Sequence, residues 1–271
     1  MALSVQLQMS LPVTITFTCA EVGENHVGME AIDRQGNPGQ KAKRGFTVKE
    51  LKQTASKLTT EGYDAQVIDL EPPEEYIDQL DKIAGILIVR NFLDRDQAEE
   101  LLGQCESLEW DSKYYDRRRK KVLNKHLRRN LLFADFAQEP NYEEGKGRVV
   151  PIEDVPMLDE TLQRIENLFP LGALKTGPLI VEGNLYHDLK KSGIGFHGDT
   201  ERRIVIGFRV GSEMNLVYEW YHRSARIGKR YEFVLGPGDL YAMSDKATGW
   251  DWRSPQKVTL RHAAGCDKVT R

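Results

Sequence analysis

The sequence of 271 residues has only three cysteines, Cys19, Cys105 and Cys266, which are widely spaced and form no CxxC pair. An odd, scattered set cannot form a disulfide framework, so the sequence predicts a reducing, intracellular location, cytoplasmic or nuclear. Long apolar runs are also lacking, because Ile83 to Val89 is far too short to span a bilayer. Met1 to Leu11 has neither a basic nor an apolar leader region, so we expect no signal peptide and no membrane partner.

The excess of one charge sign is small, with 38 Lys and Arg against 41 Asp and Glu and a net charge of -3. This balance excludes a uniformly basic nucleic-acid coat and an acidic disordered chain. It hides a basic run, Lys113 to Arg129, with a local charge of +8, which leaves -11 for the remainder. The run indicates either a phosphate-contacting surface, with Tyr114 and Tyr115 able to stack on bases, or a solvated helix face or loop.

Residues 1–75 are expected to form a small α/β accessory domain and a linker. Val13 to Thr18 alternates as a half-buried strand does, and Ala65 to Leu70 resembles a second strand. Between them, Thr47 and Glu50 form a capping box. The box begins a helix with an apolar face of Val48, Leu51, Ala55 and Leu58. Paired prolines in Glu71 to Glu75 indicate the linker. This unit shows no catalytic pattern, and docking, lid formation and dimerisation remain open as its role.

Residues 76–271 are expected to form the larger domain. It begins with a strand at Ile86 to Val89 and a helix capped by Asp94, and a further amphipathic helix spans Pro156 to Phe169. Six short strands then follow, at Leu179–Tyr186, Arg203–Val210, Leu216–Tyr221, Tyr231–Leu235, Asp239–Met243 and Val258–Ala263. Many short strands separated by turn signals predict a sandwich or barrel, and the fold class is therefore α+β.

The sharpest local motif is Phe196-His197-Gly198-Asp199. Side chains at i and i+2 of a strand share a face, so His197 and Asp199 can point at one centre. With a distant imidazole they would form the facial triad of non-haem Fe(II) oxygenases. Of the six histidines, His262 in the last strand is our candidate, and a satisfied core histidine is the alternative. Arg271 follows nine residues later and suits a carboxylate through its guanidinium fork.

Two groups of motifs resemble the AlkB-like branch of the 2-oxoglutarate/Fe(II) dioxygenases. The first is Asn184-Leu185-Tyr186 followed by Ile194 to Glu201, which contains the His-x-Asp motif and an acidic residue soon after it. The second is the strand Ile86 to Val89 with Asn91-Phe92-Leu93, followed by a helix and Leu108-Glu109-Trp110. The resemblance covers roughly residues 80–271 and implies a double-stranded β-helix, or jelly roll, with flanking helices.

The resemblance implies a role for each matched residue. Asn184 and Tyr186 would hydrogen-bond 2-oxoglutarate, and His197, Asp199 and a distal histidine would hold Fe(II). Glu201 would stand where the family reads a flipped base. The chain departs from the family after Gly238 to Met243, where it has Trp250 and Trp252 and no histidine.

The carboxylate-binding arginine implied by the family matches either Arg261 or Arg271. Neighbours in a strand face opposite ways, so Arg261 and His262 cannot both point inward without a bulge. We therefore prefer His262 with Arg271.

The resulting functional hypothesis is a 2-oxoglutarate- and Fe(II)-dependent dioxygenase that hydroxylates or demethylates its substrate. A modified nucleobase in nucleic acid is the first candidate substrate, which would have to leave the duplex. The substrate-binding residues predicted for it, besides Glu201, are Tyr218, Trp220, Arg117, Arg118 and Arg119. Aromatic residues in strands are more often core residues. The alternatives are a protein or small-molecule hydroxylase on the same iron centre, and a metal-free jelly-roll binding module.

Overall fold

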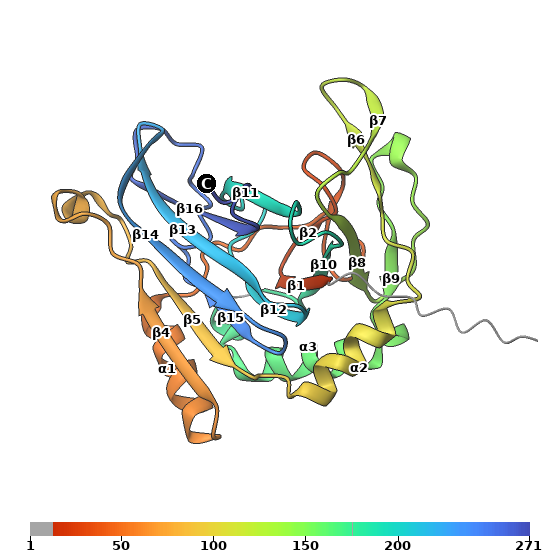
Figure 1. Ribbon diagram of the computed structural model, residues 1–271, viewed down its shortest axis with the longest axis horizontal. Coiled ribbons are helices and arrows are strands. Elements are labelled where there is room, and N and C mark those ends of the chain that lie inside the picture. Colours follow the sequence, from red (N-terminus) through yellow and green to blue (C-terminus); the bar gives the residue numbers. More distant parts are fainter. Residues whose placement is uncertain (1–12, 175) are drawn as a thin grey trace, which may run out of the picture.

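The computed structural model describes residues 13–174 and 176–271 (Figure 1). The segment 1–12, for which the sequence predicts no signal peptide, lies outside the described residues. The protein is a mixed α/β structure that consists mostly of β-sheet. Among the described residues, no helix is both long and apolar enough to cross a membrane.

Two sheets form the body of the protein. The large sheet has the strand order β4 (Asp64–Asp69), β5 (Gly85–Arg90), β15 (Leu240–Met243), β12 (Ile206–Gly211), β1 (Thr14–Ala20), β10 (Ile180–Tyr186), β8 (Arg129–Ala134) and β9 (Val149–Pro151). The small sheet has the order β11 (Gly193–His197), β16 (Thr259–Gly265), β13 (Met214–His222) and β14 (Ala225–Leu235). Two ribbons add the pairs β2 (Gly23–Glu24) with β3 (Ala31–Ile32) and β6 (Lys113–Asp116) with β7 (Lys121–Asn124).

Helices cover the outer face of the large sheet (Figure 1). These are α1 (Val48–Thr60), α2 (Arg95–Cys105) and α3 (Pro156–Leu168), while α4 (Leu171–Leu174) and 3-10 turns at Glu74–Gln79, Tyr142–Glu144 and Ile152–Asp154 are short. Strand β5 shows how the layers separate, because Leu87 and Val89 pack with the helices, whereas Ile86 and Ile88 pack between the two sheets. This is the alternation that a strand buried on both faces requires.

The expected helices and C-terminal strands are confirmed. Thr47 and Glu50 form the capping box of α1, and Asp94 caps α2. All six strands expected after Pro178 are present with shifted ends. Val13 to Thr18 was expected to be half-buried, but β1 is buried on both faces. Thr14 and Thr16 are buried and Thr18 is half-buried, because the face that the sequence pattern assigned to water points toward the cavity between the two sheets.

The N-terminal strands belong to the same sheet as the C-terminal strands. Strand β1 lies between β10 and β12 and pairs with both, and β4 pairs with β5 along its whole length. The boundary expected after residue 75 therefore separates β4 from its hydrogen-bonded partner β5. The strand–helix–strand pattern at 12–70 is present, but its two strands do not pair with each other. The paired prolines correctly indicate a connecting segment. They do not reveal that the strands on the two sides of this segment are hydrogen-bonded to each other.

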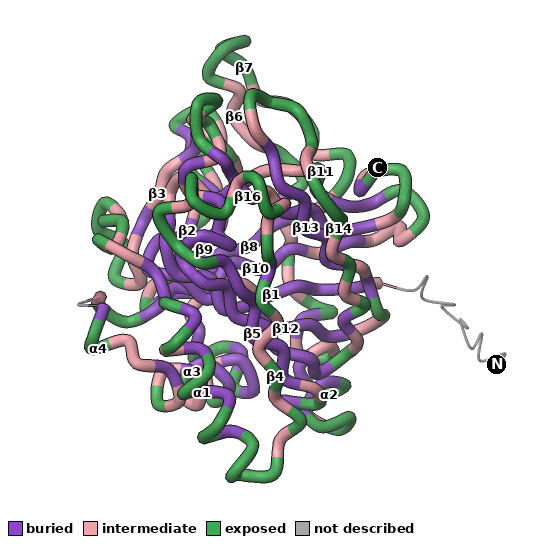
Figure 2. The backbone as a smooth tube through the Cα atoms, turned by 90° about the vertical axis from the view of Figure 1, so that its left-hand side faces the viewer, coloured by how far each residue is buried: buried purple, intermediate pink, exposed green. Residues whose placement is uncertain are grey.

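The basic run forms a β-hairpin. Strands β6 and β7 pair from Lys113 with Asn124 to Asp116 with Lys121. The arginines Arg117 to Arg119 lie in the turn, where all three are exposed. Figure 2 shows this hairpin as an exposed projection beyond the buried strands of the sheets. A hairpin is neither the helix face nor the loop that we considered from the sequence, and it presents its cations at the tip.

A buried segment follows β15 and contains a covered ion pair. The Nζ of Lys246 lies 2.8 Å from Asp251 Oδ2, and the two side chains are 2% and 1% exposed. Asp81, which is half exposed, lies 3.6 Å from the same ammonium. Removing one partner of a buried pair leaves an uncompensated charge, whereas replacing both by apolar groups does not.

We expect Lys246→Met to lower the free energy of unfolding by about 3–5 kcal/mol, because Asp251 would keep a buried charge. The double variant Lys246→Met/Asp251→Leu should recover most of that loss. Lys52→Met, which removes an exposed partner of Asp69, is the control and should cost about 1 kcal/mol or less. Urea unfolding of the four proteins measures these differences, and equal losses for Lys246→Met and Lys52→Met would contradict the assignment.

Candidate metal centre

The two candidate histidines face each other across paired strands. His197 is the last residue of β11, and the register of β11 with β16 places it opposite His262. Directly paired residues of antiparallel strands point to the same face of the sheet. The His197 Nδ1 lies 2.8 Å from the Gly195 carbonyl oxygen, which fixes the ring and leaves its Nε2 free. This is the usual way in which a ligand histidine is oriented.

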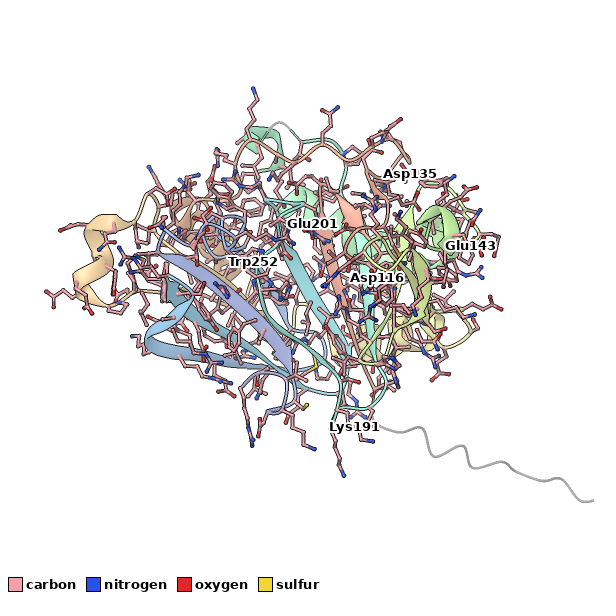
Figure 3. All side chains as sticks on the ribbon, turned by 90° about the horizontal axis from the view of Figure 1, so that it is seen from above. Asp116, Asp135, Glu143, Lys191, Glu201 and Trp252 are labelled. Carbon is pink, nitrogen blue, oxygen red and sulfur yellow. The ribbon has the colours of Figure 1, made fainter. Side chains whose placement is uncertain are left out.

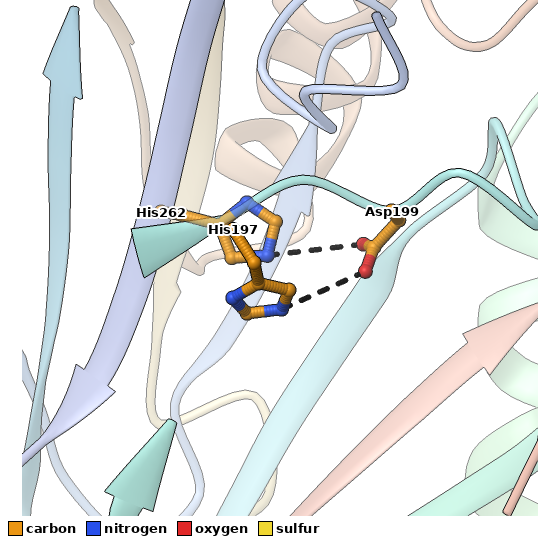
Figure 4. Close-up of side chains that lie close together, drawn as sticks. All are labelled: His197, Asp199 and His262. Carbon is orange, nitrogen blue, oxygen red and sulfur yellow. Dashed lines mark ion pairs between the residues drawn. The ribbon is translucent and has the colours of Figure 1, made fainter. Parts of the chain in front are cut away.

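Asp199 completes the group from the loop that follows β11. Its Oδ1 lies 3.8 Å from His197 Nε2, and its Oδ2 lies 3.8 Å from His262 Nε2 (Figure 4). One ligand atom from each of the three residues lies within 4.8 Å of the others. Nitrogen and oxygen ligands lie about 2.1 Å from a divalent metal ion, so two ligand atoms 3.8 Å apart can bind the same ion. The donor set of two imidazoles and one carboxylate fits the facial triad of non-haem Fe(II).

Burial sets the protonation of the group. Burial holds the pKa of His262 well below its usual range, and the neighbouring His197 acts in the same direction. His262 is therefore neutral, which is the form that binds metals. Burial also raises the pKa of Asp199, and the charges of Arg202 and His197 oppose this rise. A cation between these side chains would remove the penalty for ionising the carboxyl group.

A cavity of about 410 Å³ lies between the two sheets and includes the three candidate ligands. Its interior is lined by Thr16, Tyr186, Arg209 and Tyr241 of the large sheet. Its other end is lined by Glu201, Trp252 and Arg253 and by four residues of the turn 24–28, which are Glu24, His26, Val27 and Gly28. In the view of Figure 3, Glu201 lies between Trp252 and the hairpin residue Asp116. We refer to this second end of the cavity as the mouth.

Arg209 was not predicted, although it is the most unusual group in the cavity. Its side chain is completely buried, its Nε donates to Thr16 Oγ1 at 3.1 Å, and its Nη1 donates to the Met214 carbonyl. Its Nη2 has no hydrogen-bond partner within the described ranges. An unpaired buried cation is costly, so an anion in the cavity would stabilise it. The available signal was an arginine in the middle of the apolar strand Ile204 to Val210.

Of the four residues predicted to bind the cosubstrate, two line the cavity and two do not. Asn184 and Tyr186 both line the cavity. The Oδ1 of Asn184 already accepts from Arg128 Nε at 2.8 Å and from Asn130 Nδ2 at 2.5 Å. The guanidinium of Arg261 stacks on the Tyr221 ring at 4.0 Å, on the side of β16 opposite to His262. Arg271 is exposed. Neither Arg261 nor Arg271 lines the cavity.

The predicted substrate-binding residues lie in three different places. Glu201 lines the mouth, where its Oε1 accepts from Arg202 Nε at 2.9 Å. Tyr218 and Trp220 are completely buried between the sheets and cannot stack on a substrate. This is a correction, and its reason is that β13 lies inside the small sheet and turns both rings into the core. Arg117 to Arg119 lie outside the cavity, at the tip of the neighbouring hairpin.

The fold and the site define a mostly β mixed α/β protein with a candidate metal centre of two histidines and one aspartate. No family model matches the sequence. The chain is 40% identical over 260 residues to the uncharacterized protein R156 of Acanthamoeba polyphaga mimivirus. The match covers 95% of this chain and 98% of the viral protein, and the chain belongs to the same family as that protein.

Removal of a predicted ligand should weaken metal binding. Loss of an outer-shell partner typically costs about 10–100-fold in affinity, so we expect at least that from His197→Ala, Asp199→Ala or His262→Ala. His222→Ala is the control, because its ring packs against Tyr76 outside the cavity. Titration with Co(II), followed by its visible absorption, measures the four affinities. Unchanged affinity in a folded His262→Ala protein would refute the assignment of the third ligand.

Proposed function

We propose that the two sheets form a jelly roll in which β1 takes the position of the last strand. The support is the strand order, because β10 to β16 in sequence supply β10, β12 and β15 to the large sheet and β11, β13, β14 and β16 to the small one. A jelly roll needs an eighth strand between the first and third. Here that position, between β10 and β12, is occupied by β1.

We propose that the protein is an Fe(II)- and 2-oxoglutarate-dependent dioxygenase similar to the AlkB-like branch. One observation carries this proposal: the His197, Asp199 and His262 donors share a cavity with Arg209, whose Nη2 has no hydrogen-bond partner among the described residues. The three donors would hold Fe(II). Arg209 would bind the far carboxylate of 2-oxoglutarate, the role that we expected of Arg271 or Arg261. Bound Fe(II) with 2-oxoglutarate and O₂ would supply the oxidation, with conversion of 2-oxoglutarate to succinate and CO₂.

The protein's own groups would bind and orient the reactants. Thr16 holds the Arg209 Nε, so the guanidinium is fixed before a carboxylate arrives. Tyr186 and Tyr241 line the same end of the cavity, and burial raises the pKa of both hydroxyls, which keeps them as donors. The covered position between the sheets excludes bulk water and strengthens each of these interactions. The substrate would enter from the mouth, beside Glu201 and Trp252.

For the substrate, we propose a modified nucleobase in nucleic acid. The support is the basic hairpin beside the mouth, where the side chain of Arg117 lies next to Gly28, a residue of the mouth. A hydroxylated N-methyl group would break down to formaldehyde, whereas a hydroxylated carbon would persist. Two alternatives remain. A protein or small-molecule hydroxylase would form succinate with a protein or metabolite, and a metal-free binding module would form none.

Purified protein with Fe(II) should convert 2-oxoglutarate to succinate, and Asp199→Ala should abolish this. Arg209→Met should raise the Michaelis constant for 2-oxoglutarate about tenfold or more, because a hydrogen bond to a charged group contributes about 1.5–3 kcal/mol. Its affinity for Co(II) should not change. Arg95→Met, at an exposed arginine of α2, is the control. Absence of succinate with a panel of methylated oligonucleotides, proteins and metabolites would leave the binding-module hypothesis.

Charge reversal in the hairpin turn should weaken binding of a single-stranded oligonucleotide. We expect Arg118→Glu/Lys120→Glu to lower the affinity most at low salt, and to reduce the slope of log affinity against log salt by about one per phosphate contact. Lys49→Glu/Lys57→Glu on α1 makes the same change in charge at exposed positions away from the hairpin. Fluorescence anisotropy measures the slopes, and equal effects of the two double variants would refute a specific role of the hairpin.

A further inference from the structure

Lys125 belongs to the basic run, but its ammonium is turned inward. Its Nζ donates to Asn25 Oδ1 at 2.6 Å, to the Asn25 carbonyl oxygen at 3.3 Å and to Asn130 Oδ1 at 3.0 Å. An ammonium has three donors, and these three acceptors match them. Lys125 directly follows β7, and its backbone N–H donates to the Ser112 carbonyl just before β6. It therefore holds the base of the hairpin.

The first partner, Asn25, belongs to the turn 24–28, whose other residues line the mouth. It is fully buried, and its Nδ2 donates to Asp111 Oδ2 at 2.8 Å. Gly147 packs against it so closely that a Cβ there would lie 2.6 Å from the Asn25 side chain. Asn25 is followed by His26 to Gly28, which line the mouth. The contact with Lys125 thus fixes this turn.

The second partner, Asn130, leads to strand β10 of the large sheet. Asn130 accepts from Lys125 through its Oδ1 and donates through its Nδ2 to Asn184 Oδ1 at 2.5 Å. Asn184 lies on β10 and lines the cavity. One ammonium therefore connects the turn 24–28 with the large sheet, through groups that are each satisfied by hydrogen bonds. Such fully connected buried networks hold their members in one arrangement.

The hairpin is joined to the same turn. The rings of His26 and Tyr114 stack with their centroids 3.7 Å apart and an angle of 17° between their planes. The side chain of Arg117 packs over Gly28, where a Cβ would lie 3.6 Å from its Cδ. Movement of the turn would therefore displace the hairpin that carries the exposed cations.

We propose that Lys125 is a positioning residue that fixes the mouth of the cavity and the hairpin in one arrangement for substrate binding. The identification of this side as the substrate side rests on the proposed function. Burial lowers the pKa of Lys125 to about 7, and Asp111 and Glu182 oppose this effect. Covering this ammonium thus has a cost that the exposed cations of the hairpin do not have, and the network offsets it.

Hydrogen exchange of the full-length protein tests the proposal. In Lys125→Met, amides of residues 24–30 should exchange about tenfold faster or more, as expected for loss of hydrogen bonds to a charged group. The exchange of residues 193–199 and the affinity for Co(II) should not change. The affinity for a single-stranded oligonucleotide should fall about tenfold, because the mouth and hairpin lose their common anchor. Lys113→Met removes an exposed ammonium from the same hairpin and is the matched control.

Unchanged exchange of residues 24–30 in a folded Lys125→Met protein would overturn the proposal. Faster exchange over the whole chain would do so too, because it would indicate a general loss of stability. If Lys125→Met does not fold, Lys125→Arg keeps the charge but not the compact three-donor geometry, and its exchange is judged in the same way. If the wild-type protein neither turns over 2-oxoglutarate nor binds the oligonucleotide, the proposed function fails, but the exchange comparison still decides the role of Lys125.

Discussion

The candidate site depends on the register of β16 between β11 and β13. This register places His262 directly opposite His197 on one side and Tyr218 on the other. Because side chains alternate along a strand, a slip by one residue would turn Arg261 inward and His262 outward. Close backbone contacts oppose such a slip. Gly265 has a φ of +132° and packs on Gly193, and a Cβ at either position would press on the facing strand.

A second set of constraints holds the loop that follows Asp199. The Asp199 N–H donates to the Thr248 carbonyl, and a Cβ at Gly198 would collide with the Gly249 carbonyl oxygen. Arg202 then pairs with the buried Glu182 at 2.6 Å. Arg203 pairs with Asp245 at 2.6 Å, and Glu21 accepts from its backbone N–H. Each of these acidic groups comes from a different part of the chain. The position of the carboxylate therefore depends on the assembled fold rather than on the His-x-Asp motif alone.

Features that depend on neighbouring residues could be predicted from the sequence, whereas features that depend on pairing between distant segments could not. The capping boxes of α1 and α2 arise from neighbours in the chain, so local patterns predicted them. The His-x-Asp pattern singled out His197 and Asp199, although Asp199 reaches the group from a loop and not from the strand face that we expected. The placement of β1 between β10 and β12 arises from pairing between residues 160 or more positions apart, which no local pattern encodes. Arg209 was missed for that reason, because only this pairing brings Thr16 to its guanidinium. Tyr218 and Trp220 failed as surface residues because alternation within a strand does not reveal a second covering sheet.

The position of β1 also changes how the resemblance applies to the end of the cavity that contains Arg209. The resemblance places the carboxylate-binding arginine near the end of the chain, at Arg261 or Arg271. In the structure, the strand beside β10 and β12 is β1, whose interior face carries Thr16 and Thr18. A threonine cannot neutralise a carboxylate, but it can orient a cation that does. A basic group from an adjacent strand is then needed, and β12 supplies Arg209 beside Thr16. Under the function that we propose, the carboxylate-binding arginine therefore comes from β12 and not from the positions that the resemblance implies.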